Sequence, residues 1–193
     1  MRNIINMIFF SWIGLLFWTL LFYNVGWRVM FVPSSSMEKT LFPGDFYIAN
    51  MHAYGINAPT LYNFWNPKLT EKLLIKKPET GDIIIFEHNE TLLIKRCIAN
   101  EGDKITISKN NVIVNGKVNP FKNFSYYDKS IFNKANVKEL FQIVPSGHCF
   151  VLGDNRNNSK DSRFIGAIPY KNIIGKASFR FISLKEDHMY KKL

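Results

Sequence analysis

The sequence predicts a mainly β protein, in which a single N-terminal transmembrane helix precedes an antiparallel β-sheet or barrel-like domain. Two observations carry this prediction. No side chain between Asn3 and Trp27 is charged. Beyond residue 28, the apolar runs are short, rich in β-branched and aromatic residues, and separated by turn residues. With 193 residues, 47% of them hydrophobic, the chain is long enough for one anchor and one globular core.

The predicted anchor runs from Ile4 to Tyr23. As a helix, this segment would reach roughly 30 Å, about the thickness of a hydrocarbon core. The alternative is a cleaved signal peptide, but the run is long, contains bulky Phe, Trp and Tyr residues, and lacks a small-x-small cleavage site. We therefore expect residues 1–28 to form a retained anchor and residues 29–193 a β-rich domain, with residues 104–145 as a smaller inserted β region.

Within the β-rich domain, short apolar runs predict strands at residues 46–51, 83–86, 92–98, 112–114 and 150–152. The Asn residues and the Asn115-Gly116 pair around residues 112–114 are typical of tight turns. Residues 56–79 mix Pro, Asn, aromatic residues and lysines, which favours a long loop or an extended hairpin. Residues 119–138 are similarly polar and aromatic, and we expect an excursion from the fold there.

The net charge of +10 indicates a partner with negative charge. Nucleic acid is disfavoured because the lysines are dispersed and no Arg-rich helix or aromatic-basic signature occurs. Attraction to anionic lipid headgroups beside the anchor explains the charge more simply. The basic residues flanking the anchor, Arg2 and Arg28, encode its orientation only weakly.

The cysteines and histidines predict neither a disulfide framework nor a metal site. Cys97 and Cys149 each lie in an apolar, strand-like run where a buried thiol is ordinary. The four histidines, at positions 52, 88, 148 and 188, have no metal-ligand spacing.

Two residues suggest nucleophilic chemistry, although each has an ordinary alternative. Ser36 follows Pro33 in a serine-rich segment soon after the anchor, which by itself is typical of a solvated linker. Lys95 interrupts an apolar strand and shares a face with Leu93 and Cys97. Burial lowers a lysine pKa by up to about 3 to 5 units, and the resulting free amine can act as a base toward a serine. The alternative for Lys95 is a solvated edge-strand lysine.

The segment from Gly153 to Arg163 is dense in turn-forming and charged residues, as a loop that organises a site would be. A solvated loop, with Asp161 and Arg163 as a local ion pair, is the alternative. Five blocks occur in a fixed order: Pro33-Ser34-Ser35-Ser36-Met37, Gly81-Asp82, Lys95-Arg96, Gly153-Asp154-Asn155-Arg156 and Ser159-Lys160-Asp161-Ser162-Arg163.

Together with the apolar N-terminus, these blocks resemble bacterial type I signal peptidase, a membrane-bound Ser/Lys endopeptidase that removes signal peptides from exported proteins. The resemblance runs from the anchor to about Ser183. It implies Ser36 as the nucleophile and Lys95 as the general base. It also implies Ser34 as an oxyanion donor and Ser159 as the serine that holds the lysine amine. It further implies structural support of the site by Asp154, Arg156, Asp161 and Arg163, and substrate pockets lined by Met30, Val32, Pro33 and Ile94.

By the same resemblance, the chain needs no cofactor, and its partners are signal-peptide-bearing preproteins, membrane lipid and the protein-export translocon. Its place would be the bacterial cytoplasmic membrane, with a single pass and the catalytic domain on the outer face. The sequence departs from the family pattern at three places. Ser35 replaces the usual glycine, Ile98-Ala-Asn-Glu-Gly-Asp lacks the usual first glycine and proline, and Asn157 stands where aspartate is common.

Three other functions remain open at this point. The first is a dedicated processing peptidase of the same fold, for a conjugative or secretion component. The second is a non-catalytic, membrane-tethered module that binds peptide or lipid. The third is a Ser-His-Asp hydrolase that uses His148.

Overall fold

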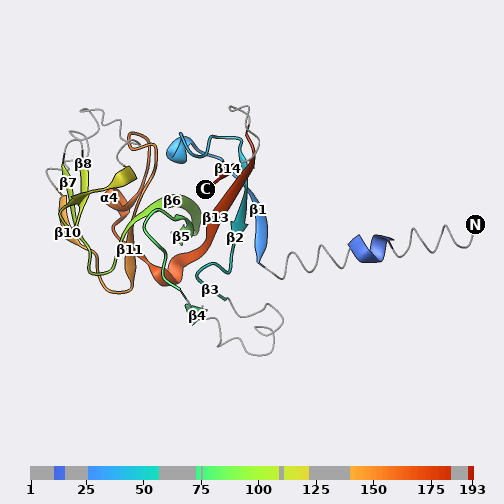
Figure 1. Cartoon of the computed structure of the whole chain (residues 1–193), viewed down its shortest axis with the longest axis horizontal. Helices are drawn as coiled ribbons and strands as arrows, with labels where there is room; N and C mark the ends of the chain where they lie inside the picture. The colour runs from blue at the N-terminus through green and yellow to red at the C-terminus, as the bar shows by residue number, and fades with distance from the viewer. Residues whose placement is uncertain are drawn as a thin grey trace, which may run out of the picture.

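The computed structural model describes residues 11–15, 26–56, 73–74, 76–108, 111–121, 140–183 and 191–193. Residues 11–15 are helical, and no helix within the described ranges is long and apolar enough to cross a membrane. The rest of the anchor predicted over Ile4–Tyr23 lies outside the described residues, so the anchor stays a prediction. From Trp27 onward the described chain is mainly β-structure, as the sequence predicts (Figure 1).

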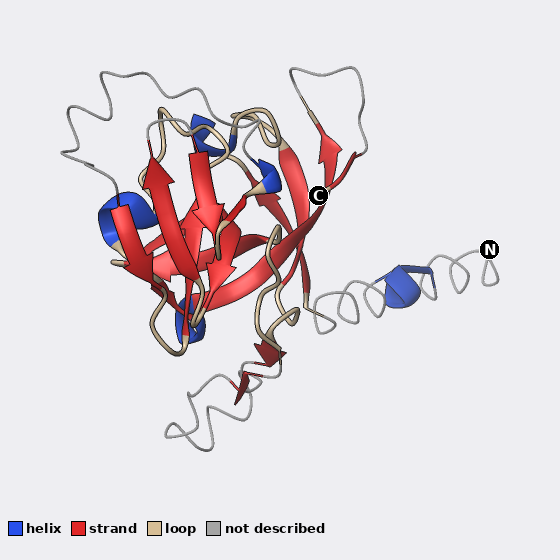
Figure 2. Ribbon diagram, turned by 60° about the vertical axis from the view of Figure 1, so that its left-hand side comes forward, coloured by secondary structure: helices blue, strands red, loops and turns tan. Residues whose placement is uncertain are grey.

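Eight strands of the described chain form one main sheet, which is strongly twisted (Figure 2). They are β1 (Trp27–Phe31), β2 (Phe46–Asn50), β5 (Ile83–His88), β6 (Thr91–Asn100), β11 (His148–Leu152), β12 (Ile168–Pro169), β13 (Ile173–Ile182) and β14 (Lys191–Lys192). Their order is β1-β2-β13-β5-β6-β11-β12, with β14 beside β13. All of these pairs are antiparallel.

Two smaller sheets complete the β-structure of the described chain. The four-stranded sheet has the order β10-β7-β8-β9 and consists of β7 (Lys104–Ser108), β8 (Asn111–Val114), β9 (Lys117–Val118) and β10 (Leu140–Ile143). The third sheet pairs β3 (Gly55–Ile56) with β4 (Leu73–Leu74). Strand β3 ends at the first residue of the region 56–79 that is predicted as a loop or extended hairpin, and β4 lies within that region. Short helices of the described chain include η1 (Ser35–Met37), α4 (Ser162–Ile165) and η3 (Tyr170–Asn172).

The five strands expected from apolar runs all occur, as β2, β5, β6, β8 and β11. Sequence reasoning missed β13, a ten-residue strand at the centre of the main sheet. Lys176 and Arg180 interrupt its apolar pattern, and each is compensated by an acid from elsewhere in the chain. Lys176 donates to Asp82, and the Arg180 guanidinium lies 3.6 Å from the Asp45 carboxylate. Arg180 is fully buried, and a buried charge is tolerated only with such a partner, which the local sequence does not reveal.

Strand β6 connects the three apolar clusters of the core. Ile94 belongs to the first cluster, which also contains Val32 and Met37. Cys97 belongs to the second, where Cys149 is a further buried free thiol. Ile98 and Ala99 belong to the third, through which the four-stranded sheet packs on β6 and β11. Lys95 and Arg96 therefore lie where the clusters meet, at the point on β6 where pairing with β11 begins.

Candidate active site

Ser36 lies in η1, the 3-10 turn that follows the extended segment after β1. Ser34, at the start of the turn, is extended with φ −132° and ψ 159°. The turn is anchored by Met37, whose side chain is fully buried in the first core cluster together with Leu41. Ser36 itself is 8% exposed. The burial of Met37 therefore fixes where the Ser36 hydroxyl points.

Lys95 is brought to Ser36 by strand β6. Its Nζ donates a hydrogen bond to Ser36 Oγ at 2.7 Å and a second one to the carbonyl oxygen of Ile94 at 2.8 Å. The lysine is only 2% exposed. The structure thus joins the two residues that the sequence marks as nucleophile and base, although 59 positions separate them.

Burial lowers the pKa of Lys95 from 10.5 to about 8, because desolvation disfavours the charged ammonium. The carboxylates of Asp161 and Asp154 act in the opposite direction and raise the pKa. Each of these carboxylates is itself held by an arginine, Asp161 by Arg163 and Asp154 by Arg96. A substantial fraction of the amine is therefore neutral near pH 8, as a general base requires.

Ser34 and Ser159 both lie close to Ser36. The Ser34 and Ser36 Oγ atoms are 3.4 Å apart, so the two hydroxyls share one small space. Ser159 Oγ is buried and has no hydrogen-bond partner among the described residues. A Cβ at Gly153 would come within 2.1 Å of Ser159 Oγ and 2.6 Å of the Ser36 carbonyl oxygen. Ser159 therefore packs beside Ser36 across Gly153, and its predicted bond to the lysine amine stays a prediction.

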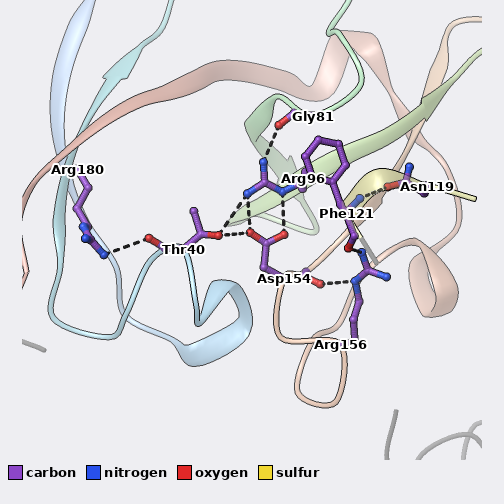
Figure 3. A network of polar contacts seen from close by, with 9 residues as sticks. Thr40, Gly81, Arg96, Asn119, Phe121, Asp154, Arg156 and Arg180 are labelled. Carbon is purple, nitrogen blue, oxygen red and sulfur yellow. Dashed lines mark hydrogen bonds and ion pairs between the residues drawn. The ribbon is translucent and has the colours of Figure 1, made fainter. Parts of the chain in front are cut away.

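Asp154 forms a buried, bidentate ion pair with Arg96, the residue after Lys95 (Figure 3). Arg96 Nε donates to Asp154 Oδ1 at 2.8 Å and Nη2 to Oδ2 at 2.6 Å. Thr40 Oγ1 donates to the same carboxylate at 2.6 Å, and Arg96 Nη1 donates to the Gly81 carbonyl oxygen at 2.8 Å. The pair thus ties β6 to the loop after β11. The sequence places Arg96 in the Lys95-Arg96 block but predicts no role for it, and it gives no sign of Thr40.

The other three predicted support residues hold the same loop. Arg156 Nε donates to the Gly153 carbonyl oxygen at 3.0 Å. Asp161 caps helix α4 and accepts the Gly153 backbone N–H at 2.9 Å. Arg163 pairs with Asp161 at 2.8 Å and also donates to the Arg156 carbonyl oxygen at 2.8 Å. These bonds close the loop on itself and fix Gly153 beside the nucleophile.

Two asparagines of the loop contact the nucleophile turn directly, which sequence reasoning missed. The backbone N–H of Asn155 donates to the Ser36 carbonyl oxygen at 3.0 Å, and its side chain donates to the Ser35 carbonyl oxygen at 3.1 Å. Asn158 Nδ2 donates to Ser35 Oγ at 2.8 Å. Ser35, which replaces the usual glycine, therefore gains a side-chain bond to the loop.

Three of the four predicted pocket residues pack in one apolar cluster. Val32 and Ile94 are buried in the first core cluster, and Met30 packs against it. Pro33 is exposed. On β6, pairing with β11 begins only at Arg96, so among the described strands residues Thr91–Lys95 pair with β5 alone. One edge of this half-strand therefore has no strand partner beside Lys95 within the described ranges.

The alternative of a Ser-His-Asp hydrolase that uses His148 finds no matching geometry in the described part of the chain. The ring nitrogen Nδ1 of His148 lies 2.7 Å from the Ser146 carbonyl oxygen, whereas the Ser36 hydroxyl is bonded to Lys95. Among the described residues, no group of three or more His, Cys, Asp and Glu side chains is placed to hold a metal ion.

Comparison with known proteins gives a family match over most of the chain. The model of the family described as signal peptidase, peptidase S26, matches residues 2–182. Signal peptidase I of Buchnera aphidicola subsp. Acyrthosiphon pisum is 30% identical over 213 residues, which cover 76% of this chain and 65% of that protein. Signal peptidase I of Pseudomonas aeruginosa is 30% identical over 193 residues, covering 82% of this chain and 66% of that protein.

The chain thus spans slightly less than two thirds of the length of these two relatives. A crystal structure of a signal peptidase I from Enterococcus faecalis V583 is 29% identical and covers 53% of this chain and 97% of its own, with a TM-score of 0.40.

Proposed function

This chain belongs to the signal peptidase family, peptidase S26, and we propose that it is a serine endopeptidase that cleaves signal peptides from exported preproteins at a membrane surface. The observation that carries the proposal is the 2.7 Å contact between the Lys95 amine and the Ser36 hydroxyl in a buried setting. A desolvated lysine amine within hydrogen-bond distance of a serine is the arrangement of a base and its nucleophile.

In the proposed mechanism, the neutral Lys95 amine accepts the Ser36 proton while Oγ attacks the carbonyl carbon of the scissile bond. The negative charge that develops on the carbonyl oxygen is stabilised by the Ser36 backbone N–H and the Ser34 hydroxyl. Loss of one such donor typically lowers the rate by about 10² to 10³. Protonated Lys95 then gives its proton to the leaving amine, which becomes the N-terminus of the mature protein.

An acyl-enzyme on Ser36 remains after this step. Lys95, neutral again, accepts a proton from a water molecule that attacks the ester carbonyl, and the collapse of the second intermediate restores the Ser36 hydroxyl. The 3.4 Å between the Ser34 and Ser36 hydroxyls supports the role of Ser34, because both then lie at the place where the oxyanion forms.

We place the substrate as an extended chain beside the open edge of residues 91–95. A peptide added there as a strand gains backbone hydrogen bonds, and its alternate side chains point into pockets. Small side chains at the first and third positions before the cut fit shallow apolar pockets. The cluster of Met30, Val32 and Ile94 supports this placement, because Ile94 directly precedes Lys95 on β6 and packs in the same apolar cluster as Val32 and Met30.

The proposal includes a membrane-bound protein, with residues 1–28 as the anchor and residues 29–193 as the catalytic domain on the outer face of a bacterial cytoplasmic membrane. Membrane lipid and the export translocon are its proposed partners. Support comes from large apolar side chains exposed on β1, β2 and β13, which are Val29, Phe31, Phe46 and Ile182. The Phe31 and Phe46 rings lie 5.4 Å apart, so these side chains form a continuous apolar face on the strand that follows the predicted anchor.

The catalytic proposal is tested with Ser36→Ala and Lys95→Ala in the full-length protein. Each variant loses preprotein cleavage, and Ser36→Ala also loses labelling by a serine-reactive acylating inhibitor. Ser146→Ala and Lys171→Ala change an exposed serine and an exposed lysine outside the site and serve as matched controls. Circular dichroism checks that all four variants are folded. Cleavage retained by either site variant refutes the dyad, and a wild-type protein that binds peptide without cleaving it indicates the non-catalytic module.

The membrane proposal is tested with nitroxide labels at Val29→Cys and Ile143→Cys in the protein reconstituted into vesicles. The two positions are similarly exposed, at 56% and 53%, but lie on the main and the four-stranded sheet respectively. The label at position 29 is expected to be more accessible to lipid-soluble oxygen than to a water-soluble nickel reagent. The label at position 143 is expected to be more accessible to the nickel reagent than to oxygen. Equal accessibility at both positions contradicts a lipid-facing β1.

A further inference from the structure

We propose that Phe121 is a positioning residue for the Ser36–Lys95 pair, which it stabilises by covering Arg96 and holding Arg156. This inference rests on the proposed peptidase function, and it assigns a role in that function to the region of the four-stranded sheet. Phe121 follows β9 and comes from a segment that the sequence predicts only as an excursion from the fold.

The position of Phe121 is fixed on three sides (Figure 3). The guanidinium carbon of Arg96 lies 4.9 Å from the centroid of its ring. The tip of the ring packs on Gly81, where a Cβ would come within 2.8 Å of Phe121 Cζ. The backbone N–H of Phe121 donates to the side chain of Asn119 at 2.9 Å, and Asn119 is itself buried. The aromatic ring is therefore held against the arginine.

The ring covers the part of Arg96 that hydrogen bonds leave unprotected. A guanidinium directs its donors within its own plane, and those of Arg96 bond to Asp154, Gly81 and Thr40. Its flat faces carry no donors, and an aromatic ring stacks on such a face favourably. Phe121 thereby excludes water from a buried ion pair, whose attraction is stronger in a dry environment.

The effect reaches Ser36 through the loop after β11. Arg96 holds Asp154, and Arg156 holds the carbonyl oxygen of Gly153. Arg156 is in turn held by the Phe121 carbonyl oxygen, to which its Nη2 donates at 3.2 Å. Asn155, between the two anchored residues, donates its backbone N–H to the Ser36 carbonyl oxygen at 3.0 Å. A loop released from either arginine no longer fixes the nucleophile against Lys95.

The charges around Lys95 give this role a distinct signature. The groups that act on its amine are the Ser36 hydroxyl from η1 and the carboxylates of Asp154 and Asp161, and both carboxylates raise its pKa. When Arg96 moves away from Asp154, the carboxylate is less neutralised, and water reaches the amine more easily. Both changes favour the ammonium form, so the pKa of Lys95 rises. A residue that served only stability would leave this pKa in place.

The test compares Phe121→Leu with Val114→Ala in the full-length protein. Val114 packs on the same apolar cluster as Phe121, so Val114→Ala controls for lost packing. We expect Phe121→Leu to lower kcat for preprotein cleavage about three- to thirtyfold, the range of a desolvated cation–π contact, with KM within about twofold of wild type. The acid limb of its pH–rate profile moves to higher pH, whereas that of Val114→Ala stays in place.

The inference is overturned if the acid limb of the pH–rate profile of Phe121→Leu coincides with that of the wild-type protein, whatever the change in kcat. If Phe121→Leu does not fold, 3,5-difluorophenylalanine at position 121 decides, because fluorine weakens the attraction of the ring for a cation with little change in shape. We expect this variant to shift the limb in the same direction by a smaller amount, and an unmoved limb again overturns the inference. An inactive wild-type protein, by contrast, refutes the proposed function on which the inference rests.

Discussion

Replacing Asp154 with asparagine removes one charge from the buried ion pair beside the dyad and keeps the side-chain volume nearly unchanged. The carboxylate is fully buried and accepts bonds from Arg96 Nε, Arg96 Nη2 and Thr40 Oγ1 at 2.8, 2.6 and 2.6 Å. Without it, the Arg96 cation stays buried without its countercharge. Breaking a buried pair in this way costs about 3 to 5 kcal/mol. For a domain of this size, about 2 to 4 °C per kcal/mol then predicts a fall in Tm of about 6 to 20 °C.

The same substitution has a catalytic consequence of known sign. The Asp154 carboxylate raises the pKa of Lys95, so its removal lets the pKa fall further below about 8. The acid limb of the pH–rate profile of Asp154→Asn therefore moves to lower pH, opposite to the shift expected for Phe121→Leu. Water admitted by a looser loop opposes this shift, whereas the lost carboxylate and the Arg96 cation left without its countercharge both lower the pKa of Lys95 and set the sign.

The assay is thermal unfolding of the full-length protein in detergent, followed by preprotein cleavage between pH 6 and pH 9. Glu79→Gln is the matched control, because it breaks the exposed ion pair between Glu79 and Lys76, and such surface pairs add little to stability. A Tm of Asp154→Asn within about 2 °C of the control refutes the assigned importance of the buried pair. A shift of the acid limb of the Asp154→Asn pH–rate profile to higher pH refutes the statement that the Asp154 carboxylate raises the pKa of Lys95.

Two further predictions follow from the geometry of the site. Cleavage by the wild-type protein rises with pH through an apparent pKa near 8, because only the neutral form of Lys95 accepts the Ser36 proton; a cleavage rate that is constant from pH 6 to pH 9 contradicts a desolvated lysine base. Gly153→Ala places a Cβ 2.6 Å from the Ser36 carbonyl oxygen, so it displaces the nucleophile and lowers cleavage by at least about tenfold; full cleavage in a steady-state assay contradicts the close packing at this point.

Most of the strands that the sequence predicts share one property, which is a run of apolar residues that needs no distant partner to be stable in a sheet. Residues 83–86 and 150–152 are of this kind, and they lie in β5 and β11. Strand β13 is different because the buried Arg180 is tolerated there only with Asp45, and the partly exposed Lys176 pairs with Asp82. The acids lie far away in sequence, so local patterns give no sign of the compensation.

The candidate site divides in the same way. The order of the blocks and the residue types indicate that Ser36 and Lys95 act on each other. Asn155, Thr40 and Phe121, by contrast, are residue types that occur in many settings without a role in a site. Their roles arise only from their neighbours: Asn155 contacts the nucleophile turn, Thr40 the Asp154 carboxylate, and Phe121 the face of Arg96. No local pattern encodes such contacts.

The sequence by itself determined the antiparallel β class, the positions of five strands and the resemblance to a Ser/Lys peptidase, because each depends on residue type and order along the chain. Tertiary structure alone decided the 2.7 Å between Ser36 and Lys95 and the fall of the lysine pKa to about 8. The physical reason is that distance and desolvation depend on packing between segments remote in sequence. A chain can specify such packing without displaying it in any short pattern.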